Sequence, residues 1–153
     1  RRDPMAMLPF CGYNMADYWS HWINTGQQKG VRLPKIYYVN WFRKDDDGQF
    51  IWPGFGENSR VLKWIFERCE GTAETVETPI VNLPNVDGLD FSGLGLSNDQ
   101  IAELLRVEVD GWLEEIPLIE DYYASYGNHV PEELHKELRE LKTRLEDAKQ
   151  AAA

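Results

Sequence analysis

Residues 35–62 read KIYYVNWFRKDDDGQFIWPGFGENSRVL, and this stretch decides the fold. Its first eight residues are dense in β-branched and aromatic side chains, which favour a β-strand. Gln49–Trp52 has the same character and follows Asp47-Gly48, a dipeptide typical of tight hairpin turns. We therefore predict a β-hairpin, a glycine-rich loop and then a helix, which indicates an α/β fold of the mixed α+β kind.

The helix after the loop is expected over Ser59–Cys69, where apolar side chains recur at helical spacing. Asn58 or Ser59 is the natural N-cap, and Gly71 is placed to end the helix. The helical stripe comprises Val61, Leu62, Ile65, Phe66 and Cys69.

Three consecutive aspartates, Asp45–Asp47, raise the question of a calcium loop. With Gly48 placed at the glycine of an EF-hand loop, Arg43 falls at the first ligand position and Gly54 replaces the bidentate glutamate. The metal interpretation fails, and we interpret the aspartates as a solvated turn.

Working toward the N-terminus, Asn14 is a good N-cap for a helix that Gly26 can end. Its aromatic stripe is more typical of core than of a ligand site, and His21 lies off it as a structural residue. The stripe comprises Met15, Tyr18, Trp19, Trp22 and Ile23.

Toward the C-terminus, Ser97–Gln100 is a capping box that opens a short helix. Asp110–Tyr126 is helix-like, although Pro117 must begin, kink or end a segment. Pro131 opens a last helix, whose leucines are too few for a coiled coil and are expected to dock on the same domain. These leucines are Leu134, Leu138, Leu141 and Leu145.

Charge and aromatic content divide the chain into an aromatic, slightly basic front and an acidic back. Residues 1–70 carry ten Lys or Arg and eight Asp or Glu, whereas residues 71–153 carry six and eighteen. Fourteen of the nineteen aromatic residues precede residue 67. We expect a planar, anionic ligand on residues 1–70, an extended connector over 71–96, and an acidic helical tail over 97–153.

The net charge of −10 argues against a sequence-independent grip on nucleic acid. No run approaches the ~18 apolar residues of a membrane span, and no secretory leader is visible. Cys11 and Cys69 indicate reduced thiols in a cytoplasmic setting. The start at Arg1 suggests that an upstream part is missing.

Motifs for catalysis are absent from the sequence. It holds no phosphate-binding G-x-x-x-x-G-K-[ST], no H-E-x-x-H, no C-x-x-C and no G-x-S-x-G. Three scattered histidines and two distant cysteines have no metal-site spacing. We assign neither a catalytic nor a metal-ligating residue.

A slot for a flat ligand is the one constellation with a plausible function. Phe42 and Phe50 flank the hairpin turn, and Phe55 lies between two glycines whose missing side chains allow close backbone approach. Together with Trp41, these rings could stack on a heterocycle, at about 1–3 kcal/mol per base. Alternatively, they pack a small core while Asn58 caps the helix, and composition leaves both interpretations open.

Selection of a purine needs a hydrogen-bonding group at the edge of the base, and Asn58 is suitable. Its amide can donate to O6 of guanine and accept from N1–H or the exocyclic amine, whereas adenine has the opposite polarity. An amide left unpaired by the wrong base costs about 1–3 kcal/mol.

Two segments closely resemble a known family. Val39-Asn-Trp-Phe-Arg-Lys-Asp45, Gly48 and Phe50–Leu62 are similar to the C-terminal signature of GTP-dependent phosphoenolpyruvate carboxykinase. Arg2–Asn14 resembles the segment that follows the active-site lid of that family. The resemblance is strong from Arg1 to Leu83 and weaker through the acidic helices.

The resemblance implies a lyase of gluconeogenesis, a decarboxylase that converts oxaloacetate and GTP to phosphoenolpyruvate, CO2 and GDP. It places guanine between Phe42 and Phe55, with Phe50 and Trp41 lining the pocket. The loop Phe55-Gly56-Glu57-Asn58 is then expected to contact the nucleotide, with Asn58 at the base edge.

The resemblance also implies that the phosphate loop, the ligands of Mn²⁺ and Mg²⁺, and the oxaloacetate-binding arginines lie upstream of Arg1. We expect a monomeric, cytoplasmic parent enzyme with no nucleic-acid or membrane partner, and an inactive fragment. The alternatives are a stand-alone purine-binding module and a purely structural piece.

Overall fold

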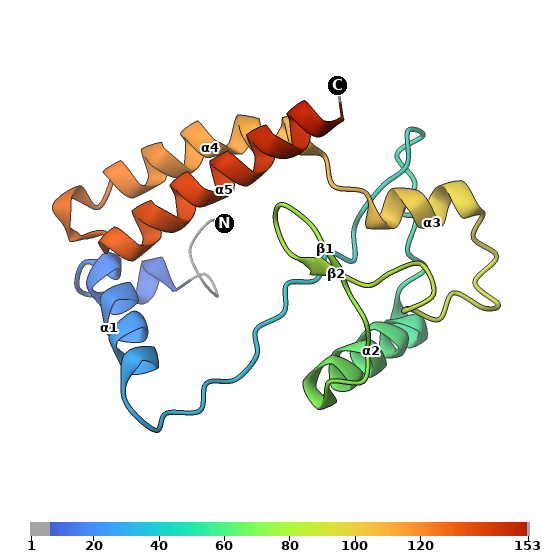
Figure 1. Cartoon of the computed structure of the whole chain (residues 1–153), viewed down its shortest axis with the longest axis horizontal. Coiled ribbons are helices and arrows are strands. Elements are labelled where there is room, and N and C mark those ends of the chain that lie inside the picture. The colour runs from blue at the N-terminus through green and yellow to red at the C-terminus, as the bar shows by residue number, and fades with distance from the viewer. Residues whose placement is uncertain (1–6, 153) are drawn as a thin grey trace. The chain divides into compact units, whose positions relative to one another are not determined.

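The computed structural model describes residues 7–152 and shows helices together with short antiparallel strands (Figure 1). The predicted mixed α/β class is therefore confirmed. The chain divides into two compact units, one made of Arg1–Pro34 with Glu108–Ala153 and the other of Lys35–Val107. The division expected from the sequence, into 1–70, 71–96 and 97–153, stays a prediction. Of the segments that the resemblance used, residues 1–6 lie outside the described part.

The first unit is helical. It contains η2 (Leu8–Phe10), α1 (Met15–Gln27), α4 (Val109–Ala124), η4 (Gly127–His129) and α5 (Glu132–Ala151). The long helices α4 and α5 pack side by side and are joined through η4 (Figure 1). Leu138 and Leu145 of the predicted stripe are buried. The last helix therefore docks within its own unit, on α4.

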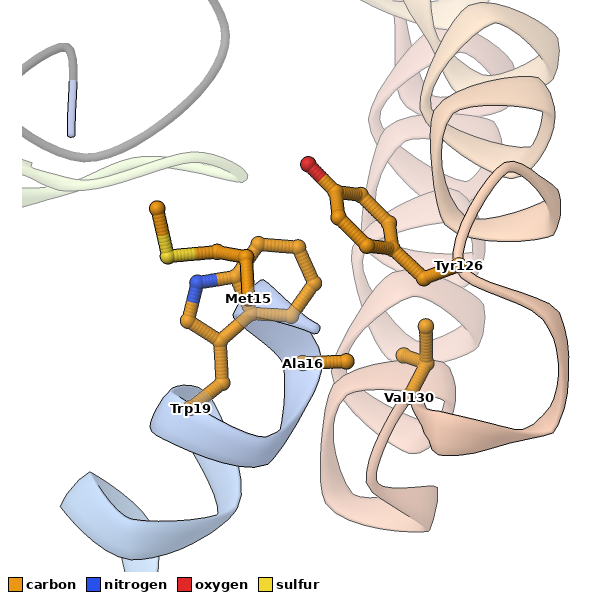
Figure 2. Packing of buried hydrophobic residues seen from close by; sticks show 5 residues of the cluster. All are labelled: Met15, Ala16, Trp19, Tyr126 and Val130. Atoms are coloured by element: carbon orange, nitrogen blue, oxygen red, sulfur yellow. The ribbon is translucent and has the colours of Figure 1, made fainter. Parts of the chain in front are cut away.

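The start of α1 packs on the turn that joins α4 to α5. Figure 2 shows Met15, Ala16 and Trp19 opposite Tyr126 and Val130, and all five side chains are buried. The ring centroids of Trp19 and Tyr126 lie 4.9 Å apart. This cluster confirms that the first half of the predicted aromatic stripe is core.

The predicted helix boundaries of this unit are only partly correct. Asn14 is the N-cap, because its Oδ1 accepts from the Ala16 backbone N–H at 2.9 Å. Gly26 does not end the helix, which continues to Gln27. The structure also settles the position of Pro117, which lies inside α4 and neither begins nor ends it.

The second unit holds the stretch that decided the fold. Its elements are η3 (Phe55–Glu57), α2 (Asn58–Glu70), β1 (Val76–Glu77), β2 (Asn82–Leu83) and α3 (Asn98–Leu105). β1 and β2 pair antiparallel, with Val76 opposite Leu83. Trp52, Trp64 and Leu89 form its buried core.

Two local signals in this unit are confirmed. Ser97 and Gln100 form both bonds of the capping box at the start of α3. Gly71 ends α2 in the left-handed conformation, with φ of +78°. Among the described helices, none is both long and apolar enough to cross a membrane.

The predicted strand over Lys35–Phe42 is wrong. The segment has no partner strand in the described part of the chain, and Ile36 and Tyr38 are each 90% exposed. It is held instead by Lys35, whose Nζ donates to the Arg68 carbonyl at 2.7 Å. A strand depends on a neighbour for its ladder, and side-chain propensity alone does not supply one.

Two expectations about α2 need correction. Leu62 and Phe66 of the predicted α2 stripe are 51% and 70% exposed, and α2 instead buries Trp64. The helix begins at Asn58 with Glu57 in the N-cap position, so neither Asn58 nor Ser59 caps it. The segment 71–96, which the sequence predicts as an extended connector, contains the β1–β2 pair. Each of these strands has only two residues, so the sequence pattern does not reveal them.

Candidate functional site

The predicted hairpin is reduced to a turn with one isolated bridge, between Lys44 and Phe50, and Gln49–Trp52 forms no strand. This hairpin tip nevertheless brings two predicted site residues together. The Ile51 N–H donates to the Arg43 carbonyl at 3.0 Å, and the Asp45 N–H donates to the Gln49 carbonyl at 2.9 Å. This pairing places the rings of Phe42 and Phe50 edge to face, with centroids 6.0 Å apart. The two rings are 69% and 57% exposed, so neither is buried in the core of this unit.

Basic side chains accompany the ring pair. The Lys44 Nζ lies 4.9 Å from the Phe50 ring centroid, a cation–π contact on one face of that ring. Arg43 does not contact the ring pair in this way; its side chain donates a hydrogen bond to Glu103 of α3 and forms an ion pair with it. Hydrogen bonds from Arg106 and Arg43 hold the pKa of Glu103 below its ordinary value. Glu103 therefore stays ionised at neutral pH and anchors the hairpin to α3.

Phe55 stands alone on the following loop. It is 97% exposed, and its φ of +47° makes it the one non-glycine residue of the described chain in the left-handed region. Gly54 before it has φ of +79° and ψ of −168°, a conformation that side chains disfavour. A bulky residue in such a conformation costs about 1–3 kcal/mol. Strain combined with full exposure makes Phe55 a candidate functional residue.

Gly56 and Glu57 each form a hydrogen bond with a residue of α2. The Gly56 carbonyl accepts from the Ser59 hydroxyl at 2.6 Å, and the Glu57 carboxylate accepts from Arg60 at 2.5 Å. Arg60 also donates to the backbone carbonyl of Asp90 at 3.1 Å and pairs with its carboxylate. Glu57 thus holds the loop in place through Arg60.

Asn58 bonds to an indole instead of capping α2. Its Oδ1 accepts from the Trp52 Nε1–H at 2.8 Å, and the Asn58 side chain is half-buried. Trp52 is buried, and Trp41 packs on it with centroids 6.4 Å apart. Trp41 is partly buried and packs against the core from its edge, and its expected place in the pocket lining stays a prediction.

Comparison with known proteins identifies the family. The family model described as the phosphoenolpyruvate carboxykinase C-terminal P-loop domain matches residues 1–144. The chain belongs to the GTP-dependent phosphoenolpyruvate carboxykinase family. It is 51% identical to phosphoenolpyruvate carboxykinase (GTP) of Treponema pallidum (strain Nichols), over 99% of this chain and 25% of that protein.

Other relatives agree. Phosphoenolpyruvate carboxykinase (GTP) of Arthrobacter sp. (strain FB24) is 50% identical over 96% of this chain, and that of Chlamydia pneumoniae is 46% identical over 96%. The matched region is 24% of the former protein and 25% of the latter. The chain therefore spans about a quarter of the length of the curated relatives it matches.

Within this carboxykinase segment, the structure forms two side-chain groups in one unit. Phe42 pairs with Phe50, and Trp41 with Trp52 and Asn58. Phe55 contacts no other ring among the described residues. The predicted residues thus share one unit, with the rings that are expected to contact the base left open to solvent.

Sequence reasoning missed Trp52 and the pair of Arg43 with Glu103. A signal existed for Trp52, because a buried indole N–H usually has an acceptor and Asn58 is six positions away. Nothing local relates Arg43 to Glu103, because they are 60 positions apart. Only the folded unit shows that contact.

A different cavity in the same unit suits an anionic ligand poorly. Its volume is about 340 Å³, and its lining includes the carboxylates of Glu67, Glu74 and Asp87. These repel phosphate groups at neutral pH. The exposed rings, flanked by Lys44, are the better candidate for a nucleotide.

Proposed function

We propose that this chain supplies the guanine-binding wall of a carboxykinase that converts oxaloacetate and GTP to phosphoenolpyruvate, CO2 and GDP. The wall consists of Trp41, Phe42, Phe50 and the loop residues Phe55, Gly56, Glu57 and Asn58. The main support for the proposal is that Phe55 has a fully exposed ring and a strained backbone conformation. Local strain persists where the surrounding structure imposes it, and it gathers at binding and catalytic sites. The name of the relatives, phosphoenolpyruvate carboxykinase (GTP), supports GTP as the nucleotide.

Stacking provides the affinity in this proposal. We place the base between Phe42 and Phe55, with Phe50 bracing Phe42 from its edge. Each aromatic contact contributes about 1–3 kcal/mol and accepts any base. Asn58 supplies the selection at the base edge, and Trp41, Gly56 and Glu57 maintain the geometry of the wall.

The chemistry proposed for this chain is positioning. Transfer of the γ-phosphoryl group to the enolate left by decarboxylation depends mainly on orientation and electrostatic stabilisation. When two rings fix the base, they also limit the positions that the γ-phosphate of the same nucleotide can take relative to the enolate. No step runs through a residue of this chain as acid, base or nucleophile.

Metal ions enter the proposal only through other parts of the protein. Among the described residues, no group of three His, Cys, Asp or Glu side chains could hold a metal ion. We propose that the ligands of Mn²⁺ and Mg²⁺ come from other parts of the protein. The proposal also includes a monomeric, cytoplasmic enzyme, and the free thiols of Cys11 and Cys69 support the reducing compartment.

Steady-state kinetics of the full-length protein test the proposal. Phe42→Ala and Phe55→Ala should each raise the KM for GTP about tenfold or more, while the KM for oxaloacetate changes little. Phe66→Ala is the matched control, because Phe66 is 70% exposed on α2 and is not part of the wall. Wild-type GTP kinetics in both wall variants would remove the assignment.

A further inference from the structure

The bond between Trp52 and Asn58 fixes the orientation of an amide. Trp52 is 6% exposed, and its Nε1 lies 2.8 Å from Asn58 Oδ1. An indole N–H can only donate, so its partner must be the carbonyl oxygen and cannot be the amide NH2. The orientation of the Asn58 side chain is thus set by the chemistry of its neighbour.

The NH2 end of Asn58 is left available. Asn58 is the first residue of α2 and follows the loop residues Phe55–Glu57 directly. With its oxygen bonded to the buried indole, its two N–H donors point away from Trp52. No acceptor in the described part of the chain takes them. Asparagine usually caps a helix start, so this departure suggests another use.

We propose that Trp52 is a positioning residue that makes Asn58 present donors to the base and so selects purines with a 6-keto group. The inference rests on the proposed function and deepens it. Amide donors match O6 of guanine or hypoxanthine and oppose the amino group of adenine. Without the indole N–H, the amide can turn over and offer its oxygen to that amino group.

A second tryptophan of the same core serves as a control that distinguishes a purely structural role of Trp52 from the positioning role. Trp64 belongs to the same buried cluster and is 7% exposed. Its Nε1 is buried without a hydrogen-bond partner in the described structure. Trp64→Phe therefore removes an indole of the same core without removing a bond to Asn58.

The experiment measures kcat/KM of the full-length protein with two nucleotide pairs that differ at position 6. One pair is ITP and ATP, and the other is GTP and 2-amino-ATP. We expect Trp52→Phe to lower the 6-keto preference in both pairs by about three- to tenfold while kcat with GTP is kept. Trp64→Phe should leave both preferences unchanged.

Equal losses with all four nucleotides in Trp52→Phe would overturn the inference, because they show a role in packing only. If the Phe variant does not fold, benzothienylalanine at position 52 keeps the bicyclic shape and removes the donor, and the same expectation applies to it. An unchanged preference in that variant also overturns the inference.

Failure of the proposed function is recognised separately. Asn58→Ala should narrow the preference for GTP over ATP, because its donors are proposed to read position 6 of the base. If it does so while the Trp52 variants do not, only the inference about Trp52 fails. If Asn58→Ala and Phe42→Ala both leave nucleotide kinetics unchanged, the proposed wall itself is wrong.

Discussion

Arg43 at the hairpin tip and Glu103 on α3 form a two-point contact across 60 positions of sequence. The Arg43 Nε donates to Glu103 Oε1 at 3.1 Å, and its Nη2 lies 2.9 Å from the same oxygen. The Arg43 Nη1 also donates to the backbone carbonyl of Arg106 at 2.7 Å. One guanidinium thus fixes the hairpin that carries Phe42 and Phe50.

Loss of this anchor should weaken nucleotide binding without abolishing it. We expect Glu103→Gln to raise the KM for GTP about two- to fivefold, because ion pairs that are open to solvent contribute little. The oxaloacetate KM should stay constant. Glu140→Gln, which removes an exposed pair with Lys136 on α5, is the control. An unaltered GTP KM in Glu103→Gln means that the hairpin is held by its own backbone.

The same anchor should give the GTP KM a dependence on acid pH. The pKa of Glu103 is lowered, by the hydrogen bond from Arg106 first and then by Arg43. The contribution of the Glu103 carboxylate to holding the hairpin is therefore complete above the ordinary pKa of glutamate. It is lost as the pH falls through the lower pKa that Glu103 has in the folded protein. Glu103→Gln should remove this part of the profile. Identical acid profiles in both proteins contradict the expectation.

Gly54 should be irreplaceable for the loop that holds Phe55. An alanine there meets no atom within 4 Å, so the penalty comes from its φ of +79° and ψ of −168°. We expect Gly54→Ala to cost about 1–3 kcal/mol of stability and to raise the KM for GTP. Gly71 has φ of +78° and equally open surroundings at the end of α2.

Comparison of the two glycines separates strain from binding. Gly71→Ala should lower the thermal midpoint and leave the GTP KM unchanged, whereas Gly54→Ala should change both. Equal GTP kinetics in the two variants would show that the loop conformation does not position the base.

Local signals in the sequence predicted local structure well. The capping box of Ser97 and Gln100, the N-cap Asn14 and the left-handed Gly71 each depend on bonds within a few residues. Such bonds form with little help from the rest of the fold. The hairpin tip belongs to this class, because its turn brings the paired residues together.

Predictions that required a distant partner were less successful. The segment Lys35–Phe42 has strand propensity, but its outcome depends on what lies beside it. Exposure of Phe66 and burial of Trp64 on α2 depend on which face meets the core of the unit. For the site, the sequence led us to propose the rings and Asn58, while the bond from Trp52 emerged only from the fold.

A crystal structure of the full-length protein with GDP tests the central claim most directly. We predict that the guanine ring lies between Phe42 and Phe55, with ring atoms of both within about 4 Å of the base. Phe55, now 97% exposed, should then be largely covered by the nucleotide. A base bound elsewhere, with Phe55 still open to solvent, would contradict the account.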